Sequence, residues 1–371
     1  MLDLAINGID LGRGRGGNES YLQGLLDGLT SEPQARAVHV LIGAHYASPE
    51  ARPKTHYIQT GDYRRMPYLL WQQSLVLRRV RYDWFLSTFF LPLIAPRQSV
   101  VFAHDLSFRS LPQSYPLSIR VYMRLLVGAA VRQARYVIVL SEFVRAEFQK
   151  FYPNVASDRI VVVYPGVSRD FTAVPAPNDD AIRARYGLSG VYLLSVSNIH
   201  PRKNLMGLLS AYRLLKERLG DAPSLIIVGQ QHWGNAQLEA QAHALGARLL
   251  GFVAQADLPA IMRGAQLLVY PSIYEGFGLP PLEAMASGVP VVCGDNSSLP
   301  EAVGDPSAGS GQVAALMVNA HSPSHIADAL ERLLADRDLR ETLHQRGLAR
   351  ARMFDWERTA RAVMAVLAHY D

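Results

Sequence analysis

Short runs of aliphatic and β-branched residues alternate with longer segments of helical periodicity along this chain, and the alternation restricts its fold more than any other feature. Helical patterns such as Glu19–Thr30 and Ile119–Gln133 separate the runs. Strands that alternate with helices form right-handed β-α-β units, so the pattern predicts a parallel sheet. The strands predicted in the first half are Leu2–Gly8, Val38–Gly43, Trp84–Ser87, Ser99–Ala103, Tyr136–Leu140 and Ile160–Val163.

The same alternation begins again in the second half of the chain. Two successive series of this kind predict an α/β protein with two Rossmann-like, doubly wound domains. Ligands of such sheets bind beyond the carboxyl ends of the strands, so we expect the domains to face each other across a cleft that holds the active site. The strands predicted in this half are Tyr192–Val196, Ser224–Val228, Ala247–Leu250, Leu267–Tyr270 and Val289–Cys293.

A segment rich in proline, asparagine and aspartate, Arg169–Tyr186, separates the two series and has the composition of a linker. We predict a first domain over residues 1–170 and a second over residues 185–354. Residues 355–371 have the apolar spacing of a helix and are expected to pack back on the first domain.

The single cysteine, Cys293, excludes an internal disulfide and fits a reducing compartment. It follows an apolar run and is expected to be buried in a strand. The first residues predict a strand and not a signal peptide, and no apolar run approaches the ~20 residues that span a bilayer. We therefore expect a cytoplasmic protein, or one on the cytoplasmic face of the inner membrane.

Positive charge is concentrated in the first half of the chain. Residues 1–168 hold 19 Lys and Arg against 12 Asp and Glu, whereas residues 169–371 hold 18 against 20. A basic half suggests a partner with phosphate groups, such as an anionic membrane or a lipid-linked pyrophosphate. Arginines mixed with apolar residues at Tyr63–Trp71 and Arg78–Arg81 suit peripheral membrane contact, and an ordinary solvated surface is the equal alternative. No nucleic acid is expected, because the arginines are dispersed and no nucleic-acid-binding motif is present.

The most informative stretch is YPSIYEGFGLPPLEAMASGVP, residues 270–290. A strand ends at Tyr270, and Pro280 and Pro281 begin a helix, which places Glu275 on the loop and Glu283 one turn into the helix. The carboxylates can accept hydrogen bonds from vicinal sugar hydroxyls. Backbone amides at the start of the helix can bind hydroxyls or an anion: those of Gly276, Phe277, Gly278 and Leu279. The alternative is an ordinary loop charge and a solvated helix charge.

A second stretch, SNIHPRKNL, residues 197–205, follows the strand that ends near Val196. Arg202 and Lys203 are predicted to begin the next helix. A guanidinium and an ammonium beside a helix N-terminus form a site for a diphosphate. A solvated basic pair is the alternative.

Three weaker patterns also follow predicted strands. The glycine-rich Gly12–Tyr21 lets the backbone approach a ligand, but it has neither the dinucleotide spacing nor the Lys-Ser/Thr of a P-loop. His104 and Asp105 come just after a strand. Residues 294–301, which include Ser298, could present amides to phosphate oxygens. A tight turn, a structural histidine and a capped turn are the respective alternatives.

Taken together, these residues resemble the retaining glycosyltransferases of family 4, which have the GT-B fold, and the resemblance covers nearly the whole chain. Two glutamates separated by seven residues within EGFGLPPLEA are highly specific for it. SNIHPRKNL and SSLPE are most similar to the branch that includes bacterial mannosyltransferases of O-antigen and capsule assembly. Other segments that carry the resemblance are GRGRGGNESY, FAHDLSF, YPGVSRDF, LIIVGQ, LLGFVAQADLPAIM, NSSLPEAVGD and FDWERTA.

The resemblance implies a role for each matching position. Glu275 would hold the transferred hexose with the amides of Phe277 and Gly278, and Glu283 would hold the ribose. Arg202 and Lys203 would bind the diphosphate and stabilise its charge as it leaves. His104 would face the sugar and the acceptor. The remaining implied donor-site residues are Gly16 and Gly17 on the diphosphate and acceptor side, and Phe252 and Val253 at the base, with Asn198, Leu279 and Ser298 nearby.

The resemblance also implies the chemistry. The family uses no divalent metal, so no metal or other cofactor is expected, and Asp336-Arg337-Asp338 in a helical stretch is a poor metal site. Transfer would retain configuration by same-face attack, with the leaving phosphate taking the acceptor proton. Ser197-Asn198 stands where family members often have arginine or threonine, and residues 305–312 are interpreted as an inserted loop at the edge of the donor pocket.

The expected partners are therefore a nucleotide-diphosphate sugar and a glycan or lipid-linked acceptor. The first candidate is transfer of mannose from GDP-mannose in bacterial cell-surface glycan synthesis. The alternatives are a UDP- or dTDP-sugar donor, or a non-catalytic module that only binds a sugar nucleotide. An epimerase shares the fold, and a phosphorylase would need a longer chain with a pyridoxal phosphate lysine.

Overall fold

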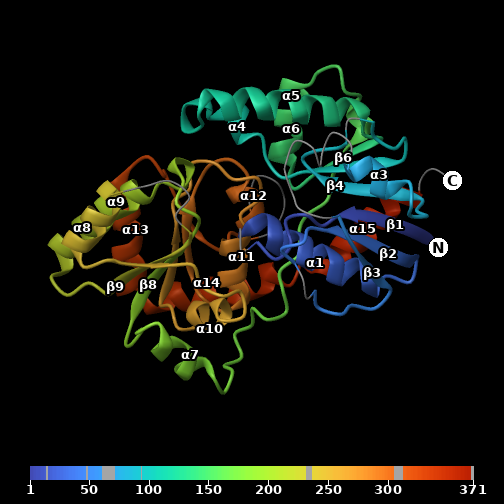
Figure 1. The fold of residues 1–371 in the computed structure, drawn as a ribbon. Coiled ribbons are helices and arrows are strands. Elements are labelled where there is room, and N and C mark those ends of the chain that lie inside the picture. The colour runs from blue at the N-terminus through green and yellow to red at the C-terminus, as the bar shows by residue number, and fades with distance from the viewer. Residues whose placement is uncertain are drawn as a thin grey trace. The chain divides into compact units, whose positions relative to one another are not determined.

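The computed structural model describes residues 1–13, 16–46, 49–60, 72–92, 94–230, 236–304 and 312–368. The chain divides into two compact units (Figure 1). The first comprises Met1–Gly166 together with Phe354–Asp371, and the second comprises Val167–Met353.

Within the described residues, the first unit contains a seven-stranded sheet in the order β3-β2-β1-β4-β5-β6-β7, and each pair of neighbours is parallel. The chain adds strands on one side of β1 and then crosses to the other side through β4, as in a doubly wound fold. The strands are β1 (Leu2–Asn7), β2 (Ala35–Ile42), β3 (Thr55–Gln59), β4 (Trp84–Thr88), β5 (Ser99–Ala103), β6 (Tyr136–Val139) and β7 (Ile160–Val162).

Helices connect these strands, as parallel pairing requires. The long helices bury one apolar face: in α5, Val127, Ala130 and Val131 join the core that also contains Val101 and Val137 of the sheet. The helices are α1 (Gly17–Ser31), α3 (Gln73–Leu77), α4 (Ser107–Ser110), α5 (Leu117–Gln133) and α6 (Glu142–Phe151), with short 3-10 turns at Pro112–Ser114 and Ser157–Arg159.

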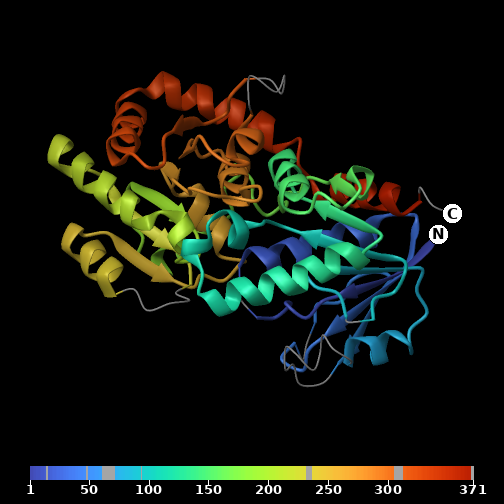
Figure 2. The same cartoon turned by 90° about the horizontal axis from the view of Figure 1, so that it is seen from above.

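The C-terminal helix α15 (Trp356–Ala368) belongs to the first unit and packs against α1 (Figures 1 and 2). The backbone of Trp356 lies against Gly28 and Gly166, and its indole ring lies over Gly24. A Cβ atom at any of these glycines would stand within 2.3 Å of an atom of Trp356. Glycine at these positions therefore allows the close approach of α15.

The second unit has a six-stranded parallel sheet in its described part, in the order β10-β9-β8-β11-β12-β13. Cys293 is fully buried in β12, as the sequence predicts, and burial raises the pKa of its thiol to about 12. The strands are β8 (Tyr192–Val196), β9 (Ser224–Val228), β10 (Arg248–Gly251), β11 (Leu267–Tyr270), β12 (Val291–Gly294) and β13 (Leu316–Val318).

Helices α8 and α13 pack together over this sheet, and Leu208, Leu215 and Leu330 are fully buried in the shared core. The helices of the unit are α7 (Asp179–Arg185), α8 (Leu205–Leu219), α9 (Ala236–Leu245), α10 (Leu258–Arg263), α11 (Leu279–Ala286), α12 (Leu299–Val303), α13 (Pro323–Ala335) and α14 (Arg337–Ala351), with a 3-10 turn, η4, at Pro201–Lys203.

The segment interpreted as a linker, Arg169–Tyr186, lies entirely within the second unit, which begins at Val167. Helix α7 forms there because Asp179 makes a buried, bidentate ion pair with Arg263 of α10 (2.6 and 2.8 Å). Arg263 also donates to the carbonyls of Asp170 and Thr172. These contacts join residues that are far apart in the sequence, so local composition cannot predict them.

The prediction of an α/β fold with two parallel, doubly wound sheets is confirmed, and most predicted strands agree with the observed ones within three residues. Strands β3 and β13 were missed. β3 is at the edge of its sheet, and none of its residues is fully buried. β13 has only three residues. Neither strand therefore has a long apolar run. Among the described helices, none is both long enough and apolar enough to cross a membrane.

Candidate active site

The centre of the second sheet is a point where the chain reverses the direction in which it adds strands. From β8 the chain continues to β9 and β10 on one side, whereas β11 pairs with β8 on the other side and leads to β12 and β13. Ligands of doubly wound sheets bind at such a switch point, beyond the carboxyl ends of the strands. The residues that follow β8 include Lys203, and those that follow β11 include Glu275.

Arg202 and Lys203 lie in the 3-10 turn η4 and do not begin helix α8, which corrects the sequence prediction. Asn204 separates the turn from the helix in the left-handed region (φ 54°), and its side-chain amide donates to the carbonyl of Ala320 (2.6 Å). The imidazole Nδ1 of His200 accepts from the backbone N–H of Arg202 (3.3 Å). The turn is therefore fixed at both ends.

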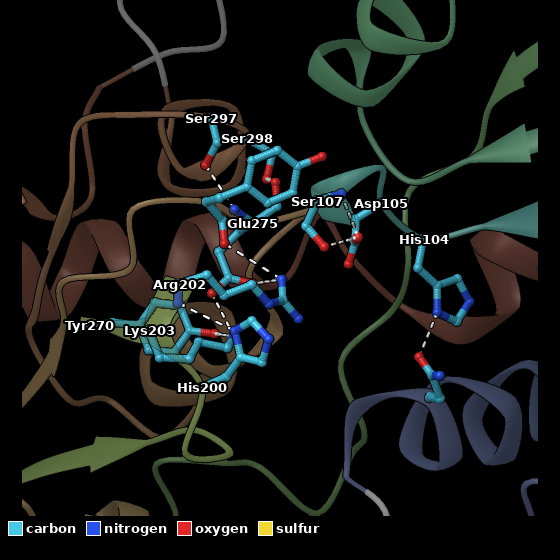
Figure 3. Close-up of polar contacts among 12 residues, drawn as sticks. His104, Asp105, Ser107, His200, Arg202, Lys203, Tyr270, Glu275, Ser297 and Ser298 are labelled. Atoms are coloured by element: carbon cyan, nitrogen blue, oxygen red, sulfur yellow. Dashed lines mark hydrogen bonds and ion pairs between the residues drawn. The ribbon is translucent and has the colours of Figure 1, made fainter. Parts of the chain in front are cut away.

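Lys203 and Glu275 form a buried ion pair (Figure 3). The ammonium Nζ lies 2.6 Å from Oε1 of Glu275 and donates to the hydroxyl of Tyr270 (2.8 Å). Only 8% of Lys203 and 5% of Glu275 are exposed. Lys203 also lies over the Tyr270 ring, 5.1 Å from its centroid, where the π face attracts a cation. This pair joins the ends of the two central strands.

Arg202 adds a second positive charge beside the same carboxylate. Its Nη1 lies 3.6 Å from Oε2 of Glu275, and a fifth of its side chain is exposed. Its backbone carbonyl accepts from the N–H of Ile273 (2.8 Å), which ties η4 to the loop after β11. Each carboxylate oxygen of Glu275 therefore faces its own cation.

Burial by itself would raise the pKa of Glu275, but the charges of Lys203 and Arg202 outweigh it and hold the pKa below its usual range. Glu275 is thus ionised at neutral pH. A carboxylate in that state accepts hydrogen bonds and does not donate a proton.

Two serines hold the backbone of Glu275. Its N–H donates to Oγ of Ser297 (3.0 Å), and its carbonyl accepts from Oγ of Ser298 (2.9 Å) (Figure 3). Ser297 has a left-handed backbone (φ 54°), which is rare for a residue with a side chain. Ser298, predicted as a donor-site residue, is fully buried, and its hydroxyl is used to position Glu275.

Glu283 has a different environment, although it lies one turn into α11 as predicted. Its carboxyl group is buried and makes no hydrogen bond or ion pair to another residue in the described part of the chain. Burial raises its pKa to about 7.

Gly278, at the N-terminus of α11, has a φ of 103°, and a Cβ atom there would lie 2.7 Å from Leu299.

The other predicted donor-site residues of the second unit also lie at loops after parallel strands. Asn198 is half-buried after β8, and after β10 Val253 is buried while 56% of Phe252 is exposed. Phe277 is buried before α11, and Leu279 is its half-buried first residue.

In the first unit, His104 follows β5 and is buried, and its Nδ1 lies 2.9 Å from the amide oxygen of Asn18 in α1. Gly16 (φ 73°) and Gly17 begin α1 after β1, and both are exposed. The glycine-rich loop and His104 are thus joined through Asn18. Residues 14–15 of that loop, and Asp305–Gly311 of the expected inserted loop, lie outside the described residues.

Asp336 and Asp338 lie at the start of α14. Asp336 is the N-cap of α14, and its Oδ1 accepts from the N–H of Leu339 (2.9 Å). In the part of the chain that the structure describes, no three His, Cys, Asp or Glu side chains are grouped so that they could hold a metal ion.

Comparison with known proteins decides the family. Residues 15–171 match the family described as Glycosyltransferase Family 4, and residues 179–350 match Glycosyl transferases group 1. The chain is 34% identical over 323 residues to the O-antigen chain mannosyltransferase B of Escherichia coli, an alignment that covers 83% of this chain and 82% of that protein. The chain belongs to glycosyltransferase family 4.

Solved structures agree in fold over the whole length of this glycosyltransferase. Sucrose-phosphate synthase from Thermosynechococcus elongatus superposes with a TM-score of 0.77 at 19% identity, covering 100% of this chain and 99% of that one. WaaG, a glycosyltransferase involved in lipopolysaccharide biosynthesis, gives 0.74 at 20% identity, covering 98% and 99%. These likenesses confirm the GT-B fold class.

Sequence reasoning missed three residues that shape this glycosyltransferase site: Asn18, Tyr270 and Ser297. Tyr270 was visible only as the end of a strand, and the pairing of its hydroxyl with Lys203 depends on the tertiary fold. Asn18 and Ser297 lie inside motifs that were singled out, but nothing in the sequence assigns them a contact.

Proposed function

We propose that this glycosyltransferase is a retaining, metal-independent hexosyltransferase that transfers mannose from GDP-mannose to a lipid-linked or polysaccharide acceptor in bacterial cell-surface glycan synthesis. The buried Lys203–Glu275 pair at the switch point of the second sheet carries the proposal. The similarity to an O-antigen chain mannosyltransferase supports the choice of sugar and pathway.

The geometry around Glu275 suits a donor with a sugar and a diphosphate. Lys203 and the partly exposed Arg202 would bind the phosphates, because fixed cations stabilise the charge of the leaving group. The ionised Glu275 would accept hydrogen bonds from hexose hydroxyls, and the amides of Phe277 and Gly278 would assist. Its backbone bonds to Ser297 and Ser298 hold the carboxylate in place before the donor arrives.

The nucleoside would bind at the adjoining loops. Glu283, buried and without a polar partner among the described residues, would accept from the ribose hydroxyls once it is ionised. Phe252 and Val253, after β10, would contact the base.

Transfer builds positive charge on the sugar and negative charge on the departing diphosphate. Glu275 is engaged by two cations, which suits it to hold hydroxyls and not to attack the anomeric carbon. In the proposed mechanism the acceptor hydroxyl attacks from the face that the diphosphate leaves, and a phosphate oxygen takes its proton. Configuration is thereby retained without a protein nucleophile.

A ligand panel followed by a transfer assay tests the donor. A bound nucleotide raises the melting temperature by mass action, so GDP should stabilise the protein more than UDP, dTDP or ADP at equal concentration. GDP-mannose with a lipid-linked acceptor and EDTA present should then yield GDP and an α-linked product. A larger shift with UDP or dTDP would reassign the donor, and nucleotide binding without turnover of any donor would favour a binding module.

We propose in addition that the first unit contacts an anionic membrane. Helix α5 exposes Leu117, Val121 and Leu125 at four-residue spacing, with Arg124 exposed among them. Apolar residues beside arginines suit an interface with acidic lipid head groups. The stretch Tyr63–Trp71, first considered for this role, lies outside the described residues. Arg78–Arg81, the second segment considered, directly follows helix α3.

Vesicle pelleting tests this contact. The protein should sediment with phosphatidylglycerol vesicles at low salt and be released at high salt, because exposed charges are screened. Leu125→Asp should reduce the pelleted fraction, whereas Ser210→Ala on the exposed side of α8 should not. Equal pelleting of Leu125→Asp and the native protein would show that α5 is not the contact.

A further inference from the structure

The imidazole of His104 is held in one orientation by aromatic neighbours in the first unit. Its ring centroid lies 4.5 Å from that of Tyr21 and 5.2 Å from that of Phe89. Phe89 has a left-handed backbone (φ 57°), unusual for a bulky residue, and its N–H donates to the carbonyl of Phe102 (2.9 Å). Strained backbone of this kind gathers at functional sites, where surrounding structure maintains it.

The hydrogen bond to Asn18 determines which ring nitrogen carries the proton. Nδ1 of His104 lies 2.9 Å from Oδ1 of Asn18. A carbonyl oxygen only accepts, so Nδ1 is the protonated nitrogen in the neutral ring. Burial lowers the pKa of His104 to about 4, against the opposing charge of Asp105, so the ring is neutral at pH 7.

The second ring nitrogen is then a hydrogen-bond acceptor. Nε2 is buried and makes no hydrogen bond to any residue that the structure describes. The neighbouring carboxylate of Asp105 accepts from both the N–H and the hydroxyl of Ser107 (2.9 and 2.6 Å). Nε2 is therefore a buried acceptor that has no donor in the described part of the chain.

We infer that Asn18 is a positioning residue that keeps the proton on Nδ1 of His104, so that Nε2 accepts a hydrogen bond from a hydroxyl of the transferred sugar or of the acceptor. The identity of that hydroxyl rests on the proposed function, whereas the state of the ring does not. His104 in this form orients a hydroxyl and does not act as a proton donor, because its Nε2 has no proton to give.

The state of the ring can be read without activity. In protein labelled with ¹⁵N-histidine, long-range ¹H–¹⁵N correlation distinguishes the two neutral tautomers, and the His104→Gln variant assigns the signal. The native protein should show His104 protonated at Nδ1 over the pH range 6–8. Asn18→Leu should move the proton to Nε2 or give a mixture.

Steady-state kinetics test the consequence for transfer. Asn18→Leu should lower kcat/KM about tenfold, the effect of one productive hydrogen bond, and leave nucleotide affinity unchanged. Asn18→Asp still accepts from Nδ1, but its negative charge raises the pKa of His104. Its activity should therefore approach the native value at high pH and fall as the pH drops, because protonation removes the Nε2 lone pair. Gln23→Leu, which removes another amide from α1, is the matched control.

The outcomes separate this inference from the proposed function. A native His104 protonated at Nε2, or unchanged kinetics in Asn18→Leu, would overturn the role of Asn18. If no donor is turned over at all, the proposed function fails, and the NMR measurement still decides the tautomer. Melting temperatures of the Asn18 variants close to that of Gln23→Leu would show that the changes are not caused by unfolding.

Discussion

The ammonium of Lys203 lies 2.6 Å from the carboxylate of Glu275, and both groups are buried although 72 residues separate them in the chain. The contact exists because β8 and β11 are parallel neighbours whose carboxyl ends meet at the switch point of the sheet. The pair matters for stability, since a charge buried without its partner is costly.

Removal of one member of this pair should destabilise the protein more than removal of both. Lys203→Met removes the nearer cation from the buried Glu275 and leaves Arg202 at 3.6 Å, and breaking such a pair costs about 3–5 kcal/mol. In Lys203→Met/Glu275→Gln the unpaired charge is gone, so part of the loss should be recovered. Urea midpoints of the four proteins in this cycle give the coupling. Additive losses would show that the two side chains do not depend on each other.

Transfer activity should respond differently to the two residues. Glu275→Ala should abolish transfer, because in the proposed site the hexose would lose its main hydrogen-bond acceptor. Lys203→Ala should lower kcat by ~10²-fold or more through loss of charge stabilisation on the leaving group. Steady-state assays with saturating donor and acceptor measure both. Native rates in Glu275→Ala would refute its role, and an unchanged kcat in Lys203→Ala would place the diphosphate elsewhere.

Because of Glu283, the free energy of unfolding should decrease as the pH rises from about 4.5 to about 7. Its pKa is raised from 4.5 to about 7, so over this range the unfolded chain releases a proton that the folded protein keeps. The folded state then binds more protons, and stability decreases with pH by at most about 3 kcal/mol from this group. Glu283→Gln should lack this contribution and be the more stable protein at pH 8. Melting curves that keep the same difference at pH 5 and pH 8 would contradict the raised pKa.

Nucleotide affinity should show the opposite trend with pH. In the proposed site, ribose hydroxyls would donate to the ionised form of Glu283, so binding should strengthen as the pH rises through about 7. Calorimetric titration with GDP between pH 6 and pH 8 measures this trend. Glu283→Gln is the control, because it keeps the titration of the nucleotide phosphate and loses that of the carboxyl. An identical pH trend in both proteins would remove Glu283 from the ribose site.

The loop that carries Glu275 should depend on Ser297 through its side chain and not only its backbone. Ser297→Ala removes the acceptor for the Glu275 N–H and keeps a Cβ at φ 54°, whereas Ser297→Gly loses the same bond but fits that φ without strain. Both should reduce kcat about tenfold, and alanine should be the less stable by about 1 kcal/mol. Assays and melting midpoints of the pair separate positioning from strain. Full activity in Ser297→Gly would show that the hydroxyl is dispensable.

Local patterns were sufficient to predict the two parallel sheets and the positions of Glu275 on a loop and Glu283 in a helix, because strand runs and a glycine- and proline-rich turn consist of consecutive residues. They failed where distant residues decide. The pairing of Asp179 with Arg263 makes a helix out of a linker-like segment, and Asn204 with its left-handed φ ends η4 before α8. The sequence predicts that Glu275 and Lys203 belong to one site, but only the fold shows that they share a buried ion pair.

The return of α15 to the first unit depends on the space that Gly24 leaves for Trp356. A Cβ atom at Gly24 would lie 1.9 Å from Cε2 of the indole. Trp356 is 8% exposed, and its ring is in edge contact with that of Tyr21. The Tyr21 ring in turn lies against His104. Gly24→Ala should therefore lower the melting temperature, although alanine favours a helix by about 1 kcal/mol. In the background of Trp356→Ala, which itself should cost about 3–5 kcal/mol, the same substitution should become neutral or stabilising because the ring is absent.

This reversal of sign distinguishes a steric contact from a general intolerance of α1 to substitution. Gly17→Ala is the matched control, since a Cβ atom there meets nothing within 4 Å, and it should leave the melting temperature unchanged or raise it slightly. If the prediction holds, Gly24→Ala should not lower the melting temperature equally in the native and Trp356→Ala backgrounds. Equal losses in the two backgrounds would show that α15 does not pack on α1 through Trp356. Because Tyr21 contacts both Trp356 and His104, transfer by Gly24→Ala should also fall below that of the native protein at a temperature where both proteins are folded.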